Sequence, residues 1–346
     1  MTSQTLTPPG GPPAGEQQHT ATARGRVLPF PITGQEIVLI VVIAALWVAL
    51  SLATPAFATS GSIVPLLVAM APVALIGIGM TVIIITGGID VSVAGIVMVC
   101  AVVVAKAMVD SGVGLPVAVL LSVVLGGVLG LVNGVLIAYG RVHAIIITFG
   151  TANLFKFLGL QFFGGTTVDN IPGTLAVFGR GEAGRTLGVP HSFLIMLVVA
   201  AAAWYYLRHT PGGRHLYAIG GDADAARLAG VKVQRRVMSA YVLTGLLTGL
   251  AACFVIARGT STLAPNVGAG MELAAIAAVV IGGTSIMGGR GSVLGTVLGA
   301  LLVQTVTSGV TQLGWRSQLS SLFIGIFILI AVGVDLLRER TRRTTT

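Results

Sequence analysis

The chain has 346 residues, of which 55% are apolar and only 9% are charged, and its mean hydropathy is +0.97. Soluble domains carry roughly 25% charged residues, so this composition excludes an ordinary soluble protein and predicts an all-α, polytopic membrane protein solvated mainly by membrane lipid. The formal net charge of +9 does not indicate nucleic acid as a partner. The basic residues lie in short segments between apolar runs and form no basic face with interleaved aromatic residues.

The first segment, residues 1–34, is rich in Pro, Gly, Thr and Gln. Such a segment cannot bury a core, so we expect a disordered cytoplasmic tail. A cleaved signal peptide is the alternative, because Ala56-Phe57-Ala58 resembles a cleavage site after the first apolar run. Both the polar leader and the apolar run are longer than in a usual signal peptide, which favours an uncleaved first span.

Ten apolar runs follow, each close to the ~20 residues that cross the hydrocarbon of a bilayer. They predict ten transmembrane helices, at 36–54, 62–86, 91–109, 115–138, 143–163, 190–208, 237–257, 272–287, 292–312 and 318–337. The runs at 91–109 and 272–287 are short and interrupted by small residues. The spans define a transmembrane domain at 35–338, followed by a basic cytoplasmic tail at 339–346.

The distribution of basic residues predicts the orientation of these spans. If both termini are cytoplasmic, 14 of the 20 Lys and Arg residues lie on the cytoplasmic side, and six of the 14 belong to the segment 208–236. Cytoplasmic loops carry an excess of Lys and Arg, so ten spans with both ends inside is the consistent arrangement. Glycines at helical spacing, such as Gly245 and Gly249, predict close packing between helices.

The segment 208–236 is the most charged internal part of the chain, with eight of the 31 charged residues in 29 positions. After a Gly-Gly pair, Asp222 suits the N-cap of a short helix, Asp224 its first turn, and Gly230 the position after its end. We interpret this helix as the surface through which a soluble partner does mechanical work on the membrane domain; the alternative is a helix that only closes a cytoplasmic loop. The candidate coupling residues are Gly220, Gly221, Asp222, Asp224, Ala225, Ala226, Arg227, Leu228 and Gly230.

Polar residues within or beside the spans are candidates for a solute path. They are Gly87, Gly88, Asp90, Asn133, Thr148, Thr151, Asn153 and Glu272. Uncharged polar groups inside a membrane either bridge helices or line a polar path, and both roles are open for these residues. For Asp90 and Glu272, capping of the next helix is the alternative to solute contact. Lys156 is an intramembrane cation that snorkels or marks the path.

Motifs of catalysis and metal binding are missing from the sequence. None of the three lysines follows glycine, so the chain contains no phosphate-binding loop of the Gly-Lys-Ser/Thr type and is not itself a P-loop ATPase. No His, Cys and Asp cluster has metal spacing, and no serine nucleophile motif occurs. Cys100 and Cys253 lie in apolar runs and imply no disulfide framework. We therefore expect no catalytic residues, no metal site and no cofactor on this chain.

Several stretches together resemble the permease subunit of ribose/galactoside-type ABC sugar importers, in the branched-chain amino acid/ribose-type permease superfamily. They are GMTVIIITGGIDVSVAGI (79–96), GLVNGVLIAYGRV (130–142), ITFGT (147–151), GGRHLYAIGGDADAARLAGVKV (212–233) and ELAAIAAVVIGGTSIMGGRGSVLGTVLGA (272–300). The resemblance implies a permease dimer, a cytoplasmic ATPase subunit that binds ATP and Mg²⁺, and an extracytoplasmic sugar-binding protein. It also implies that 212–233 is the coupling segment. The chain departs from the family at His143-Ala144 and at Asn153.

These observations predict a permease of the bacterial inner membrane that moves a monosaccharide inward with ATP hydrolysed by a partner subunit. The chief alternative is an ion-coupled secondary transporter that uses Asp90, Glu272 or Lys156 as its coupling group. A membrane-embedded enzyme would need a reactive cluster that the sequence lacks.

Overall fold

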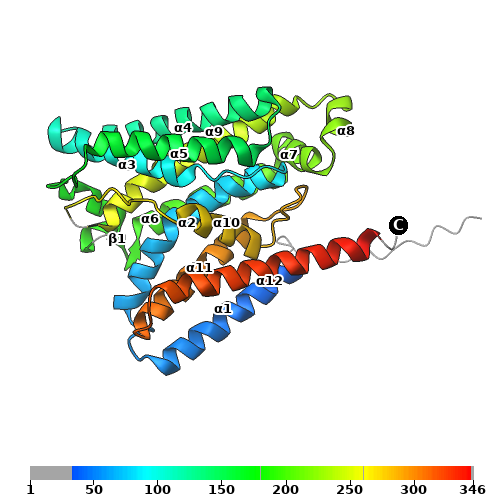
Figure 1. Cartoon of the computed structure of the whole chain (residues 1–346). Helices are drawn as coiled ribbons and strands as arrows, with labels where there is room; N and C mark the ends of the chain where they lie inside the picture. The colour runs from blue at the N-terminus through cyan, green and yellow to red at the C-terminus, as the bar shows by residue number, and fades with distance from the viewer. Residues whose placement is uncertain (1–32, 180, 260, 344–346) are drawn as a thin grey trace, which may run out of the picture. The chain divides into compact units, whose positions relative to one another are not determined.

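The computed structural model describes residues 33–179, 181–259 and 261–343, with the backbone alone described for 334–343. Apart from Thr33 and Gly34, the N-terminal segment expected to be a disordered tail lies outside the described residues. Almost all regular structure in the described part is helical, as Figure 1 shows.

Ten of the described helices correspond to the ten apolar runs of the sequence. They are α1 (Gly34–Ala53), α2 (Ser60–Ile85), α3 (Val93–Asp110), α4 (Leu115–Gly140), α5 (Ala144–Phe163), α6 (His191–His209), α9 (Val233–Arg258), α10 (Met271–Ile281), α11 (Val293–Gln312) and α12 (Gln318–Arg343). Eight of the described helices are long and apolar enough to cross a membrane, and α10 and the apolar part of α12 are shorter. The prediction of an all-α, polytopic membrane protein is confirmed.

Two helix ends differ from the predicted spans by six residues, the largest differences. α10 ends at Ile281, although the apolar run continues to residue 287, because Gly282 and Gly283 follow and Gly283 has a φ of +92°. Its 11 residues rise only about 16 Å, roughly half the hydrocarbon thickness of a bilayer. α12 continues through Arg343, beyond the predicted end at residue 337, because its last residues are mostly good helix formers.

The centre of the bundle is α2, which contacts α6, α9, α10 and α11. Its sequence is apolar on every side, and every residue from Val68 to Ile85 is buried. A helix that is apolar all round is expected to be buried rather than placed at a surface. α2 therefore forms the buried axis of the bundle, and its end at Ile85 lies beside α7 (Figure 1).

α4 and α9 pack closely along a row of glycines, as predicted. A Cβ on Gly126 would collide with the backbone carbonyl of Gly245, and one on Gly130 would collide with that of Tyr241. Ser122 reaches across the same interface and donates a hydrogen bond of 2.6 Å to the carbonyl of Gly249. Small residues are therefore required here because the two backbones lie in contact.

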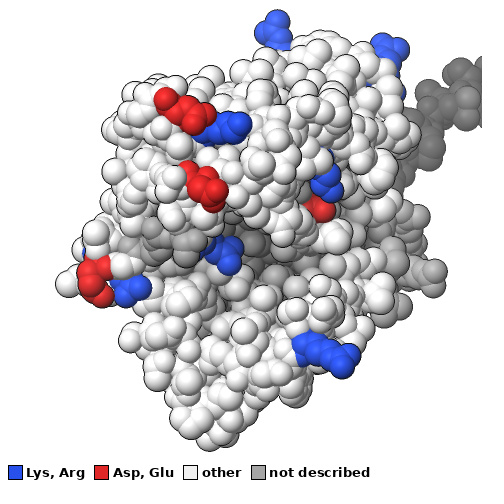
Figure 2. Space-filling model, turned by 60° about the vertical axis from the view of Figure 1, so that its left-hand side comes forward, with Lys and Arg blue, Asp and Glu red and all other residues white. Residues whose placement is uncertain are grey.

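The connections between helices lie at two opposite ends of the bundle (Figure 1). Between α5 and α6 the chain forms η1 (Gly173–Phe178), η2 (Glu182–Gly184) and an antiparallel pair of two-residue strands, β1 (Arg185–Thr186) and β2 (Val189–Pro190). Between α6 and α9 it forms α7 (Pro211–Gly221) and α8 (Ala223–Leu228), at the other end. In a view turned toward the β1 end, charged side chains are a few scattered groups on a largely uncharged surface (Figure 2).

The start of α1 lies at the α7 end of the bundle. Ser292 donates a hydrogen bond of 2.5 Å to the Glu36 carboxylate, and Gly289, in the same turn as Ser292, lies against α7. α12 runs toward this end as well (Figure 1). The first and last described helices thus share one end with segment 208–236, and the assignment of that end to the cytoplasm stays a prediction.

Candidate functional site

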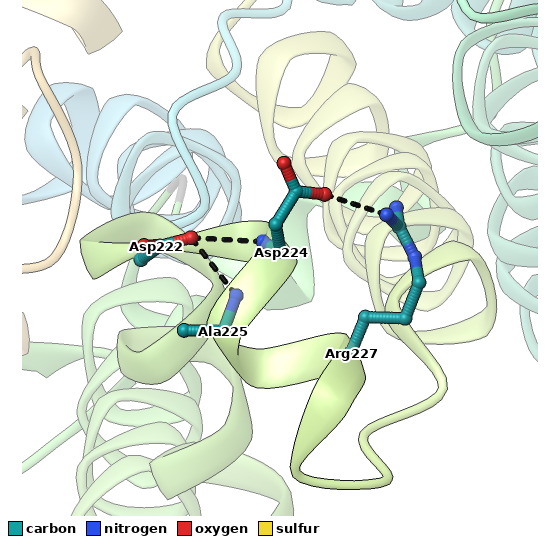
Figure 3. Close-up of polar contacts among 4 residues, drawn as sticks. All are labelled: Asp222, Asp224, Ala225 and Arg227. Atoms are coloured by element: carbon teal, nitrogen blue, oxygen red, sulfur yellow. Dashed lines mark hydrogen bonds and ion pairs between the residues drawn. The ribbon is translucent and has the colours of Figure 1, made fainter.

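The predicted short helix is α8, and its two ends have the expected caps. The Asp222 carboxylate accepts hydrogen bonds from the backbone N–H groups of Asp224 (2.9 Å) and Ala225 (3.0 Å), as Figure 3 shows. Arg227 pairs with Asp224 at 2.6 Å on the exposed side of the helix. Gly230 has a φ of +85°, the left-handed conformation that favours glycine after a helix end. These local hydrogen bonds let six residues hold a helical form.

The two apolar side chains of α8 point in opposite directions. Ala226 is only 5% exposed and packs against Ile219 of α7 and Val233 of α9. Leu228 is 91% exposed. The sequence predicted that residues 222–230 form one coupling surface. In the structure Ala226 faces α7 and α9, and Leu228 lies on the outer face of α8.

The structure adds a second helix to this segment, which the sequence analysis did not find. α7 begins with Thr210 as N-cap, whose side-chain oxygen accepts a hydrogen bond of 3.2 Å from the N–H of Gly213. Pro211 occupies the first helical position, where its missing N–H costs nothing. The Thr210-Pro211 pair is therefore a sequence signal for the start of a helix. The Gly-Gly pairs near both ends of α7 are more typical of a loop, which is why the helix was not predicted.

α7 lies directly against two turns that lead into the membrane helices. The first turn, 86–92, joins α2 to α3, and the second, 282–292, joins α10 to α11. Gly220 of α7 touches the backbone carbonyl of Ile85 and the backbone nitrogen of Gly289, and Gly289 donates a hydrogen bond of 2.9 Å to Ile85. Tyr217 donates one of 2.9 Å to the carbonyl of Gly291, and burial raises the pKa of its phenol.

Asp90 is fully buried in the first turn and does not cap α3 in the way expected. One carboxylate oxygen accepts hydrogen bonds from the backbone N–H (2.8 Å) and hydroxyl (2.6 Å) of Ser92, the residue before α3. Ser92 occupies the N-cap position of α3, and its side chain makes no capping hydrogen bond. The other carboxylate oxygen of Asp90 is buried without a hydrogen-bond partner among the described residues.

Three neighbouring helices hold the first turn in place through polar side chains. Asn133 of α4 donates a hydrogen bond of 2.7 Å to the Ser92 hydroxyl, and Thr148 of α5 donates one of 3.3 Å to the carbonyl of Ile89. Tyr241 of α9 reaches the same carbonyl at 3.5 Å. Asn133 and Thr148 thus bridge helices in this structure, and Tyr241 is a member of the group that sequence reasoning missed, since it is one aromatic residue in a buried span.

The remaining candidates lie elsewhere. Thr151 donates a hydrogen bond of 3.1 Å to Ile147 in its own helix, and Asn153 donates one of 2.9 Å to Phe149 on the exposed side of α5. Glu272 lies in the first turn of α10, and one of its carboxylate oxygens is buried without a partner among the described residues. The structure therefore gathers Gly87, Gly88, Asp90, Asn133 and Thr148 around one turn and leaves the other three candidates outside that group.

A cavity of about 660 Å³ opens between the first turn, the α4–α5 connection and segment 208–236. Its lining includes Gly87 and Gly88 from the turn, and Arg227 from α8. Gly87 has a φ of +83° and open space around its Cα, and a Cβ on Gly88 would stand 2.6 Å from the Tyr241 hydroxyl. The cavity joins the predicted path residues to the predicted coupling segment, and its other lining residues include Arg141, His143, Ile219, Ala223, Gln234 and Tyr241.

The described residues form a bundle of apolar helices with polar groups in its interior, which is the architecture of a multi-pass membrane protein. The sequence profile of the family described as "Branched-chain amino acid transport system / permease component" matches residues 62–332. The chain therefore belongs to this permease family, and the predictions of family and of a multi-pass location in the bacterial inner membrane are confirmed.

Individual relatives agree with this assignment. The chain is 39% identical over 283 residues to the ribose import permease protein of Escherichia coli K12, covering 82% of this chain and 88% of that protein. The fructose import permease protein of Rhizobium meliloti is 34% identical over 275 residues, covering 77% and 75%. An autoinducer 2 import system permease protein of Escherichia coli O9:H4 is 32% identical over 263 residues, covering 75% and 79%. No solved structure matches the chain.

Proposed function

We propose that this chain is the membrane subunit of an ABC importer and moves a monosaccharide inward with energy from ATP hydrolysed by a separate subunit. The observation that carries the proposal is its 39% identity, over 82% of its length, to a permease named for ribose import, together with the fructose import permease among its relatives. The partners are then a cytoplasmic ATPase that holds ATP and Mg²⁺, an extracytoplasmic sugar-binding protein and a second permease copy.

The outer face of α8 is the proposed contact with the ATPase. Leu228 is an apolar side chain exposed at the end of a capped helix, with Asp224 and Arg227 paired beside it. An exposed leucine next to charged groups suits a small apolar seat in a partner protein with a polar rim. Asp222 and Gly230 fix the helix ends, and Ala225 and Gly221 are exposed beside them.

The proposed sugar path runs along the exposed face of α5 to the cavity at the first turn. Asn153 is exposed near the middle of α5, whereas Val124, Val128 and Leu131 are exposed in the middle of α4. A polar amide facing lipid at mid-span is unfavourable, so this side of α5 suits a polar path at a subunit contact. Thr151 lies one turn from the cluster at the first turn, and Glu272, in the first turn of α10, is a further candidate for the path.

Asp90, Asn133 and Thr148 have a supporting part in this proposal. Their hydrogen bonds go to the first turn, so they keep Gly87 and Gly88 at the cavity wall. One carboxylate oxygen of Asp90 and the amide oxygen of Asn133 have no partner within the described part of the chain; both are acceptors, and a sugar hydroxyl is a donor that would satisfy such groups.

Uptake in reconstituted vesicles tests the proposal. The permease is combined with its ATPase and binding protein, and entry of labelled ribose, xylose, galactose and fructose is measured with and without ATP. We expect uptake of at least one of these sugars that depends on ATP and on both partners. Uptake by the isolated chain under a proton or sodium gradient, with no ATPase present, would instead establish an ion-coupled secondary transporter.

The α5 path is tested with Asn153→Leu. We expect a several-fold loss of uptake with normal assembly, because the substitution removes a polar group from the path but leaves the packed side of α5 unchanged. Val128→Leu, an exposed position on α4, is the matched control and should transport normally. A normal rate for Asn153→Leu would place the path elsewhere.

A further inference from the structure

Three glycine-rich segments meet at one point between α7 and the membrane helices. We name this point the glycine junction and define it as residues 85–88, 220–221 and 288–291. Gly220 is in contact with the backbone of both other segments, and a Cβ at this position would overlap the Ile85 carbonyl oxygen and the Gly289 nitrogen. On the other side, a Cβ on Gly288 would lie 3.1 Å from both the Gly220 carbonyl oxygen and the Gly87 nitrogen. The contact is therefore made by backbone atoms with no side chain between them.

The two membrane turns are also joined to each other at the junction. Gly289 donates its N–H to the carbonyl of Ile85 at 2.9 Å, so the end of α2 and the turn before α11 are connected where Gly220 touches both. Tyr217 lies three residues before Gly220, on the same side of α7, and donates to Gly291. Two contacts about one helical turn apart fix the orientation of α7 relative to the turns.

At its other side α7 is tied to α8. Ile219 packs against Ala226 of α8 and Val233 of α9, and Asp222 both follows the last residue of α7 and caps α8. Interiors are close-packed, so a displacement of α8 is passed to α7 rather than absorbed between them. From α7 the next contacts are Ile85 and Gly289, which are backbone atoms of the turns themselves.

We propose that α7 is the element that transmits movement of α8 to both membrane turns, with Gly220 as the point of contact and Tyr217 as a positioning residue. This inference rests on the proposed function and adds to it a route: partner, α8, α7, and then the two turns together. Because Gly87 and Gly88 form part of the cavity wall, a shift of the junction changes the shape of that cavity. Gly220 then acts inside the permease and not as a contact of the ATPase.

The chain offers a matched pair of glycines for the test. Gly220 lies within α7, and Gly325 lies within α12, outside every segment assigned to coupling or to the path, where a Cβ would have nothing within 4 Å. In the reconstituted complex we expect Gly220→Ala to hydrolyse ATP at no less than half the wild-type rate while sugar uptake falls at least ten-fold. The ratio of ATP hydrolysed to sugar transported therefore rises at least five-fold. Gly325→Ala should keep the wild-type ratio.

A second, milder variant keeps the proposal testable if Gly220→Ala does not fold. Tyr217→Phe keeps the ring and removes only the hydrogen bond to Gly291, and we expect it to raise the same ratio two- to five-fold. A merely structural role would lower uptake and ATPase activity together, in proportion to the amount of assembled complex. That result for both variants, or equal ratios for Gly220→Ala and Gly325→Ala, would overturn the proposal.

A second measurement needs no sugar. Val237 lines the cavity, and the native Cys100 and Cys253 are buried, so Val237→Cys can report the cavity through its rate of reaction with a thiol reagent. We expect a non-hydrolysable ATP analogue to change this rate at least three-fold in the complex, and Gly220→Ala to abolish the change. If the wild-type complex imports no sugar, the proposed function fails, while this labelling still decides the role of the junction. An unaltered response in Gly220→Ala would overturn it.

Discussion

In α8 the helix's own side chains supply the stabilising contacts, whereas in α7 the contacts come from distant parts of the chain. Asp222 caps α8 two and three residues on, and Asp224 pairs with Arg227 within it. α7 instead places Gly220 against Ile85 and Gly289. The segment between α6 and α9 thus contains two different helices. α8 is stabilised by its own local sequence, and α7 is positioned by contacts with the membrane turns.

This difference between α8 and α7 predicts which substitutions each helix tolerates. Leu228 on the outer face of α8 is 91% exposed, so we expect the polarity of this residue, more than its size, to matter for the proposed contact. At the inner contacts the space is already filled by backbone, so size decides and chemistry matters little. Substitutions that separate size from polarity therefore test the division between the two helices.

The largest effect is expected from Leu228→Asp. A charge placed in an apolar seat is costly when it has no partner, so we expect loss of most sugar-stimulated ATPase activity and at least a ten-fold loss of uptake. The protein itself should remain stable, since the position is exposed. Leu187→Asp is the control, because Leu187 is 99% exposed in the β1–β2 connection at the other end. Equal ATPase activity in the two variants would show that α8 does not contact the ATPase.

A second large effect is expected from Ala226→Trp. The small side chain is buried between Ile219 and Val233, so the indole must displace α8 from α7, and overpacking of this kind costs about 1–3 kcal/mol. We expect a lower midpoint of thermal unfolding in detergent and reduced uptake. Ala225→Trp, at the exposed neighbouring position, should leave the midpoint unchanged. Equal midpoints would mean that α8 is not packed on α7.

A smaller effect is expected at the first turn from Asn133→Leu. The substitution removes the hydrogen bond to Ser92, and loss of a buried hydrogen bond costs about 1–3 kcal/mol when its partner is left unsatisfied. Thermal unfolding and uptake measured side by side separate two roles. A fall in stability with proportionate uptake supports the bridging role, and a loss of uptake at unchanged stability would make Asn133 a direct contact of the solute.

The smallest energetic effect is expected from Asp222→Ala. Loss of an N-cap side chain costs about 1 kcal/mol of helix stability, and docking onto the ATPase offsets part of this loss. Hydrogen exchange at the amides of Asp224 and Ala225 should become faster, with uptake reduced less than two-fold. Asp222→Asn should restore slow exchange, because asparagine is an equally good N-cap. Unchanged exchange in Asp222→Ala would contradict the capping role.

Orientation can be tested with almost no perturbation. Leu228→Cys and Leu187→Cys are exposed at opposite ends of the bundle, and we expect a membrane-impermeant thiol reagent to label Leu187→Cys alone in intact cells. Opening the cells should expose Leu228→Cys. Labelling of both positions from the same side would contradict the ten-span arrangement with segment 208–236 in the cytoplasm.

The sequence by itself predicted the features that depend on neighbours along the chain. The ten apolar runs predicted the membrane helices, because burial in lipid demands about twenty consecutive apolar residues whatever the later packing. Asp222 and Gly230 predicted the limits of α8, because caps are local hydrogen bonds and local backbone conformations. The glycine rows predicted close helix contacts but could not say that Gly126 would meet Gly245.

Only the tertiary structure decided what lies across the bundle. Tyr241 and the carbonyl of Ile89 are 152 positions apart, and no periodicity in either segment pairs them. A helix of six residues is too short for a pattern that separates Ala226, which is buried, from Leu228, which is exposed. Nothing in the local sequence around Gly220 indicates that Ile85 and Gly289 lie against it in the folded chain. A backbone contact between distant segments is visible in the sequence only as the glycine that permits it. The partner of that glycine is set by tertiary packing and cannot be predicted from the neighbouring residues.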